Sequence, residues 1–268
     1  IGWWLESRFG PRVYRGSRYV AVSRATRDEL VELGVDGDAI TVIHNGVQRP
    51  RLDPCPDLEP RVLVLGRLVP HKRVEHVLEA AAQLRPRHPG LRVSVVGDGW
   101  WSDELVAAAA RLGVTDLVDF VGFVDEDAKA QELARSWVLA LPSLKEGWGL
   151  VVLEAAGYAV PTVGYASAGG VAESVVDGVT GLLAHDQQDF TEALDRLLSD
   201  DALRRRLGYA AEARTWEFGW DTAARSFARV LAAAAGRPVA PVVDPEPVQV
   251  HLEHPHTTTA AAPEERRP

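Results

Sequence analysis

The chain of 268 residues is 46% hydrophobic and 25% charged, which is typical of a globular protein with an ample core. Its net charge of -9 argues against broad nucleic-acid binding and against polybasic attachment to a membrane. It has no apolar run long enough to span a bilayer, and its single cysteine, Cys55, excludes an intrachain disulfide and a thiol-based metal or redox motif.

The first fifty residues are predicted to contain a strand, a helix and a connecting segment. A strand is predicted over residues 19–23, a helix directly after it, and a connecting segment over residues 40–47. The opening residues lack the basic start and long apolar core of a signal peptide. Because the chain begins at Ile1 and contains no methionine, we expect that an N-terminal part is missing.

A basic cluster follows the next apolar strand, which is predicted over residues 61–65. The segment GRLVPHKR, residues 66–73, comes directly after this strand. The guanidinium group of Arg67 can hold phosphate oxygens through two parallel hydrogen bonds, while Lys72 adds a mobile point charge. The alternative is an ordinary solvated loop, since basic residues after a strand are common.

A glycine-containing turn follows the predicted strand 92–96. Residues 97–99 read Gly-Asp-Gly, but Ser102 takes the last position of a G-x-G-x-x-G pattern. The signal for NAD is therefore weak, and a tight turn between a strand and a helix is the favoured interpretation.

A D-x-D spacing, which is able to hold a divalent cation, occurs at Asp125 and Asp127. These acids open a predicted helix, where a carboxylate caps free N–H groups and complements the helix dipole. No cluster of acids or histidines follows with ligand-like spacing. We therefore predict no metal site.

Two carboxylates eight residues apart form the most specific pattern in the chain. A strand is predicted over residues 137–141 and a helix over 150–156, with Glu146 on the intervening loop and Glu154 on the helix. The helix N-terminus offers unpaired N–H groups that suit phosphate, and carboxylates suit hydroxyl groups. A nucleotide sugar would use both features. In the alternative interpretation, Glu146 is solvated and Glu154 caps or pairs locally.

Apolar strands near Val62, Val93, Leu117, Val138, Thr162 and Leu182 alternate with helical segments. This alternation predicts an α/β fold, a Rossmann-like parallel sheet with helices on both faces. Two apolar stripes at helical spacing, near Val77 and Leu194, are predicted as core faces. A helix is expected over residues 220–235, and residues 236–268 are expected to form a disordered tail.

An ordered series of motifs resembles the donor half of a retaining GT-B glycosyltransferase of the large family-four group. The series, given by first residue, is VSRATRDEL at Val22, VIHNGV at Val42, GRLVPHKR at Gly66, VVGDG at Val95, VDFVGFV at Val118, LPSLKEGWGLVVLEA at Leu141 and GGVAESVVDGVTGLL at Gly169. The resemblance covers most of the chain. It implies a nucleotide-sugar donor as substrate, in a UDP, GDP or ADP form, without a metal or other cofactor.

The resemblance also assigns roles to particular residues. It implies that Arg67 and Lys72 neutralise the donor pyrophosphate, that Glu146 holds hydroxyl groups of the transferred sugar, and that Glu154 binds the ribose. Arg67, Lys72 and Glu146 are the expected catalytic residues. The full set of expected donor-binding residues is Gly66, Arg67, Lys72, Glu146, Gly147, Gly149, Leu150 and Glu154.

Three parts follow from these interpretations. Residues 1–50 are expected to be a remnant of an N-terminal acceptor domain with the interdomain linker, residues 51–235 the donor-binding domain with a closing helix, and residues 236–268 the tail. The expected acceptor is a glycan, a lipid or a small molecule. We expect a cytoplasmic protein in glycan biosynthesis, with membrane contact at the inner face through the absent domain.

Two alternatives to an active transferase stay open at the level of the sequence. The chain could be a non-catalytic nucleotide-sugar-binding module or one half of a split enzyme. It could also be a GT-B epimerase or phosphorylase, but the first needs acids from the absent domain and the second a pyridoxal-phosphate lysine. The two-carboxylate pattern favours nucleotide donors.

Overall fold

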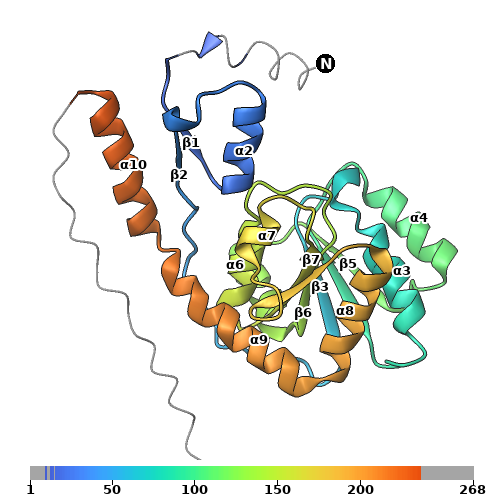
Figure 1. Cartoon of the computed structure of the whole chain (residues 1–268). Coiled ribbons are helices and arrows are strands. Elements are labelled where there is room, and N and C mark those ends of the chain that lie inside the picture. Colours follow the sequence, from blue (N-terminus) through green and yellow to red (C-terminus); the bar gives the residue numbers. More distant parts are fainter. Residues whose placement is uncertain (1–9, 11–12, 15, 237–268) are drawn as a thin grey trace, which may run out of the picture.

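The main body of the molecule is a parallel β-sheet with helices on both faces (Figure 1). The computed structural model describes residues 10, 13, 14 and 16–236. Its six-stranded sheet has the order β5-β4-β3-β6-β7-β8, and every pair is parallel. The strands are β3 (Arg61–Leu65), β4 (Arg92–Val96), β5 (Val118–Gly122), β6 (Val138–Leu141), β7 (Thr162–Tyr165) and β8 (Gly181–Ala184). The predicted fold class is confirmed.

Different helices cover the two faces of the sheet, because alternate strand residues point to opposite sides. Val62 and Val64 pack in a core with α3, α4 and α8, whereas Leu63 packs with α5 and α6. The helices are α3 (Glu75–Leu84), α4 (Ser102–Leu112), α5 (Glu126–Arg135), α6 (Leu150–Gly157), α7 (Val171–Ser174), α8 (Gln187–Ser199) and α9 (Asp201–Arg214). Both predicted apolar stripes are buried: Val74, Val77, Leu78, Ala81 and Leu84, and Phe190, Ala193, Leu194, Leu197 and Leu198.

A smaller unit precedes this sheet. It consists of β1 (Tyr19–Ala21), α2 (Arg24–Glu32), the short helix η1 (Gly37–Ala39) and β2 (Ile40–Val42), and the two strands form a separate parallel pair. The last helix, α10 (Trp220–Ala234), buries none of its residues and lies beside this unit (Figure 1). The predicted strand and helix of the N-terminal region are therefore present, and residues 40–42 of the predicted connecting segment form a second strand.

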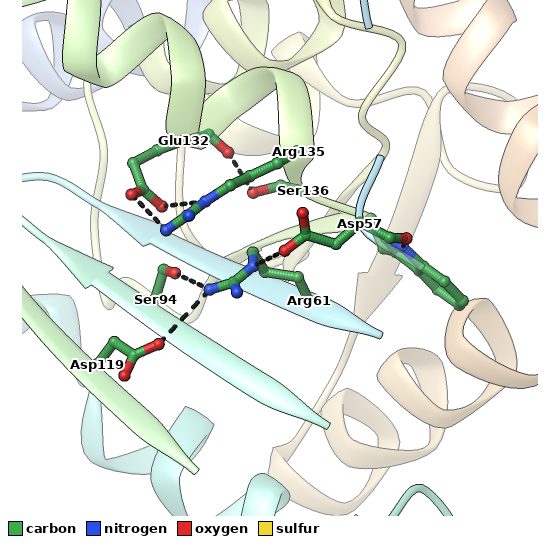
Figure 2. A network of polar contacts seen from close by, with 8 residues as sticks. Asp57, Arg61, Ser94, Asp119, Glu132, Arg135 and Ser136 are labelled. Atoms are coloured by element: carbon green, nitrogen blue, oxygen red, sulfur yellow. Dashed lines mark hydrogen bonds and ion pairs between the residues drawn. The ribbon is translucent and has the colours of Figure 1, made fainter. Parts of the chain in front are cut away.

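A polar network fixes the segment between β2 and β3, residues 43–60 and called the linker below, to the amino-terminal edge of the sheet (Figure 2). Arg61, at the start of β3, donates to Asp57 over 2.5 Å and to Ser94 over 2.7 Å, and lies 3.6 Å from Asp119. The indole N–H of Trp137 donates to the carbonyl oxygen of Asp57. Because the network lies at the opposite edge from the strand ends with the predicted site, it anchors the linker without occupying that site.

The expected tail at residues 237–268 lies outside the described residues. Within residues 16–236, no helix combines the length and the apolar character that membrane crossing requires.

Candidate functional site

The central crevice of the sheet lies between the carboxyl ends of β3 and β6. β3 leads into α3 on one face, and β6 leads into α6 on the other, so the direction of strand order reverses at this pair. Open parallel sheets bind ligands at such a switch point, where two diverging loops leave a gap. These two loops are the segments 66–73 and 142–149, which carry all the predicted site residues except Leu150 and Glu154 on α6.

Glycines form the floor beside this crevice. Gly66 and Gly97 directly follow β3 and β4, and Gly122 ends β5; their φ angles are 144°, 129° and 78°. A Cβ atom on Gly66 or Gly122 would meet no atom within 4 Å, whereas one on Gly97 would overlap the carbonyl oxygen of Gly66. The floor therefore combines tight backbone packing with an edge that lacks side chains, so a ligand can approach the main chain closely.

Two cations stand on the loop after β3. Arg67 is exposed, and no described residue forms a hydrogen bond or an ion pair with it. Lys72 ends the short helix η2 (Pro70–Lys72) and is only 18% exposed at its side chain. Gly66, Arg67, Lys72 and Ser143 line one small cavity, so the loops after β3 and β6 face each other. This brings an unpaired guanidinium group and an ammonium group to the crevice.

Lys72 and Glu146 form an ion pair across the crevice. The Lys72 Nζ atom lies 2.5 Å from Glu146 Oε1, and the hydroxyl group of Ser143 donates to the same oxygen over 2.7 Å. The Glu146 side chain is only 13% exposed. Two predicted site residues that are 74 positions apart are therefore in direct contact. The buried Ser143, which sequence reasoning did not select, is a third member of the cluster.

The loop of Glu146 is held by the loop after β7. The amide of Glu146 donates to the carbonyl oxygen of Ala168, and the amide of Gly170 donates to the carbonyl oxygen of Glu146. A Cβ atom on Gly170 would overlap the carbonyl oxygen of Gly147. The turn at Gly169 and Gly170 therefore packs against the Glu146 loop and fixes its backbone.

The N-terminus of α6 faces the crevice without a capping side chain. Its N-cap residue is Gly149, with a φ of 77°, and neither a side-chain cap nor an acid in the first turn is present. The first N–H groups of a helix lack intrahelical partners and carry the positive end of the dipole. Gly149 and the exposed Leu150 therefore offer backbone donors to an anion, as predicted from the glycine-punctuated turn.

Glu154 lies one turn further along α6 and lines a separate pocket. This pocket of about 320 Å³ is bounded by α5, α6, the linker and the start of α10, and its lining includes Arg51, Lys129, Glu154 and Tyr158. Lys129 donates to Glu154 over 2.9 Å. The structure thus places Glu154 on the helix whose N-terminus has no capping side chain, with a cation partner that could not be predicted from the sequence.

The smaller N-terminal unit contacts the same loops. Both oxygens of the Glu173 carboxylate accept from backbone amides at the start of α2, that of Arg24 over 3.0 Å and that of Ala25 over 2.8 Å. Lys145 and Glu29 form an ion pair with an N–O distance of 2.7 Å. Helix α2 is therefore fixed beside the Glu146 loop. The first turn of α2 contains no acidic residue, and Glu173 supplies the negative charge there.

An aromatic cluster joins the linker to the same loop. The ring of Trp148 stacks on that of His44 with 4.1 Å between the centroids, and Phe218 packs edge-on against Trp148. Trp148 is buried, and its indole N–H has no hydrogen-bond partner among the described residues. His44 is thus a packing residue of the linker.

The D-x-D segment caps a helix, as predicted. The Asp125 carboxylate accepts from the amide of Ala128 at the start of α5, and Asp127 pairs with Arg51. Asp98 similarly accepts from the amide of Gly99 within a strand-to-helix turn. Among residues 16–236 no group of three or more histidine, cysteine or acidic residues could hold a metal ion.

Models of two protein families match the chain. The model described as "Glycosyl transferases group 1" matches residues 54–214, and the one described as "Glycosyltransferase Family 4" matches residues 1–51. D-inositol 3-phosphate glycosyltransferase of Streptomyces bingchenggensis is 34% identical over 241 residues, which cover 81% of this chain and 53% of that protein. Glycogen synthase of Mycobacterium tuberculosis is 35% identical over 228 residues, or 80% of this chain and 54% of that protein. The chain spans about half the length of these relatives.

Two solved structures illustrate the similarity in fold. Anabaena HepE in complex with UDP and glucose has a TM-score of 0.73 and 25% identity, and the match covers 81% of this chain and 63% of that one. Sucrose-phosphate synthase from Thermosynechococcus elongatus has a TM-score of 0.78 and 24% identity, with coverage of 86% and 61%. The second similarity concerns the fold alone.

Proposed function

Because the chain belongs to the glycosyl transferases group 1, we propose that it binds a nucleotide sugar in the crevice between β3 and β6. The protein that contains it would transfer the sugar to a glycan, a lipid or a small-molecule acceptor. The single observation that carries the proposal is the cluster of Arg67, Lys72 and Glu146 at the switch point of the sheet. HepE, which was solved with UDP and glucose, supports a nucleotide sugar as the ligand.

The proposed chemistry assigns a task to each group. Departure of a nucleoside diphosphate leaves negative charge on the phosphate, and the cations of Arg67 and Lys72 stabilise that charge where it develops. The amides at Gly149 and Leu150 add donors at the positive end of α6. Glu146 accepts from hydroxyl groups of the transferred sugar. When the sugar binds, Glu146 can exchange part of its contact with Lys72, which frees the ammonium group for the diphosphate.

The finer features of the reaction belong to the proposal. We propose transfer with retention of anomeric configuration and without a metal ion, in the cytoplasm, on the basis of the resemblance in motifs. The proposed division is a remnant of an acceptor domain and linker at residues 1–50 and a donor-binding domain at residues 51–235. NMR of the product tests the proposed stereochemistry. A product with inverted anomeric configuration would contradict retention.

A second candidate is a non-catalytic nucleotide-sugar-binding module or one half of a split enzyme. The observation in its favour is that all residues of the proposed donor site lie between the end of β3 and α6. Supplying the N-terminal half of a relative in trans would distinguish the two candidates. Sugar transfer under these conditions supports the enzyme, and donor binding without transfer supports the binding module.

Substitution of Glu154 by alanine tests the donor site. We expect calorimetric titration of the chain with UDP, GDP, ADP and their glucose or mannose forms to give saturable binding of one nucleotide series. Glu154→Ala should weaken that binding about tenfold to a hundredfold, because hydrogen bonds to a charged group contribute roughly 1.5–3 kcal/mol. The matched control is Glu192→Ala, an exposed carboxylate on α8. Equal affinities of all three proteins would contradict the assignment of Glu154.

A further inference from the structure

Lys129 joins two helices at the edge of the proposed donor site. It lies in α5, and its Nζ atom is 2.9 Å from Glu126 on the same helix and 2.9 Å from Glu154 on α6. The Lys129 side chain is 21% exposed and that of Glu154 is 29% exposed, so solvent screens their attraction less than that of a surface pair. The ammonium group is therefore a fixed cation between the helices.

The charge of Lys129 persists at neutral pH. Burial acts to lower the pKa of Lys129, but its hydrogen bonds to Glu154 and Glu126 outweigh burial and raise this pKa above the ordinary value. Lys129 is the only described residue whose side chain donates to the Glu154 carboxylate, and it contacts Oε1. One carboxylate oxygen is thus held by the protein, while the other can accept from a ligand.

The position of this pair fits a role in ligand binding better than a role in the fold alone. Lys129, Glu126 and Glu154 all line the pocket of about 320 Å³, together with the linker residues Arg49 and Arg51. A carboxylate with free rotation must be ordered when a diol binds to it, and this ordering reduces affinity. A carboxylate that a cation already holds avoids most of that cost.

We propose that Lys129 is a positioning residue for the nucleotide: it orients the Glu154 carboxylate for the hydroxyl groups of the donor ribose. This inference rests on the proposed function. It adds that ribose recognition requires a cation on α5, which contacts the carboxylate and not the ligand. Lys129 therefore acts on affinity through Glu154 and only when the ligand carries the ribose diol.

The experiment compares nucleotides with and without the diol. The full chain and its Lys129→Met variant are titrated with UDP, GDP and ADP and with their 2′,3′-dideoxy counterparts. For the nucleotide that the unsubstituted chain binds, we expect Lys129→Met to weaken binding about tenfold. We expect less than a twofold change for its dideoxy form. Lys129→Arg keeps a cation and should recover part of the loss.

A control variant, and the outcomes that would contradict the inference, test the role of Lys129 separately from the proposed function. Arg85→Met removes an exposed cation that pairs with Asp116, and it should leave both affinities unchanged. Equal losses for the diol and the dideoxy nucleotide, or no loss for either, would overturn the role of Lys129 while the proposed function stands. If the unsubstituted chain binds no nucleotide, the proposed function fails and the inference with it. Melting temperatures identify a variant that fails to fold, and in that case Lys129→Arg carries the comparison.

Discussion

Replacement of Arg67 by alanine is expected to weaken donor binding about a hundredfold and to leave the melting temperature unchanged. The guanidinium group is exposed, and no described residue pairs with it, so its removal breaks no contact of the folded protein. A bidentate contact with a diphosphate contributes roughly 2–3 kcal/mol, which corresponds to the expected loss. The combination of a large binding effect and no stability effect would identify Arg67 as a ligand-binding residue.

Calorimetry and thermal unfolding measure these two quantities on the same samples. Arg206→Ala is the matched control, because Arg206 is also exposed and lies on α9. We expect this control to bind the donor as the unsubstituted chain does. Arg67→Lys should recover only part of the affinity, since an ammonium group cannot form the two parallel hydrogen bonds. An unchanged affinity in Arg67→Ala would remove this residue from the donor site.

Replacement of Gly97 by alanine is expected to lower the stability of the chain by about 3–5 kcal/mol. The φ of 129° at Gly97 is unfavourable for any residue with a side chain, at a cost of roughly 1–3 kcal/mol. The added Cβ atom would also overlap the carbonyl oxygen of Gly66. Because that atom belongs to the backbone, the floor of the crevice must shift, which costs about 1–3 kcal/mol more.

Gly122 offers a matched control on the neighbouring strand. Its φ is 78°, but an added Cβ atom would meet no atom within 4 Å. Gly122→Ala should therefore cost only about 1–2 kcal/mol, from backbone strain alone. Thermal unfolding monitored by circular dichroism measures both variants, and we expect melting temperatures lower by about 8–15 °C for Gly97→Ala and about 3–6 °C for Gly122→Ala. Equal shifts in melting temperature would show that the overlap of the added Cβ atom with Gly66 contributes nothing to the loss of stability.

The sheet could be predicted from the sequence because its strands are buried on both faces. Such strands appear as short, continuous apolar runs, as in RVLVL of β3 and VLAL of β6. The strand ends then locate the two loops of the crevice, since parallel strands end at one edge. The pairing of Lys72 with Glu146 follows from this topology, although neither the distance nor the contact with Ser143 is visible in the sequence.

Other features depend on packing between distant segments and could not be predicted. Glu126 and Lys129 are three residues apart on one helix, which is typical of a solvated ion pair on its surface. Only the packing of α5 against α6 brings Lys129 to Glu154. Glu173 contacts backbone amides of α2 that are 148 and 149 positions away, and backbone donors leave no trace in a residue pattern.

The most direct test of the donor site is a crystal structure of the chain with the nucleotide sugar that calorimetry selects. We predict that the diphosphate lies between Arg67 and the N-terminus of α6, within hydrogen-bonding distance of Lys72. The ribose should contact Glu154 and the sugar should contact Glu146. A nucleotide sugar bound away from the carboxyl ends of β3 and β6 would contradict the central claim that this crevice is the donor site.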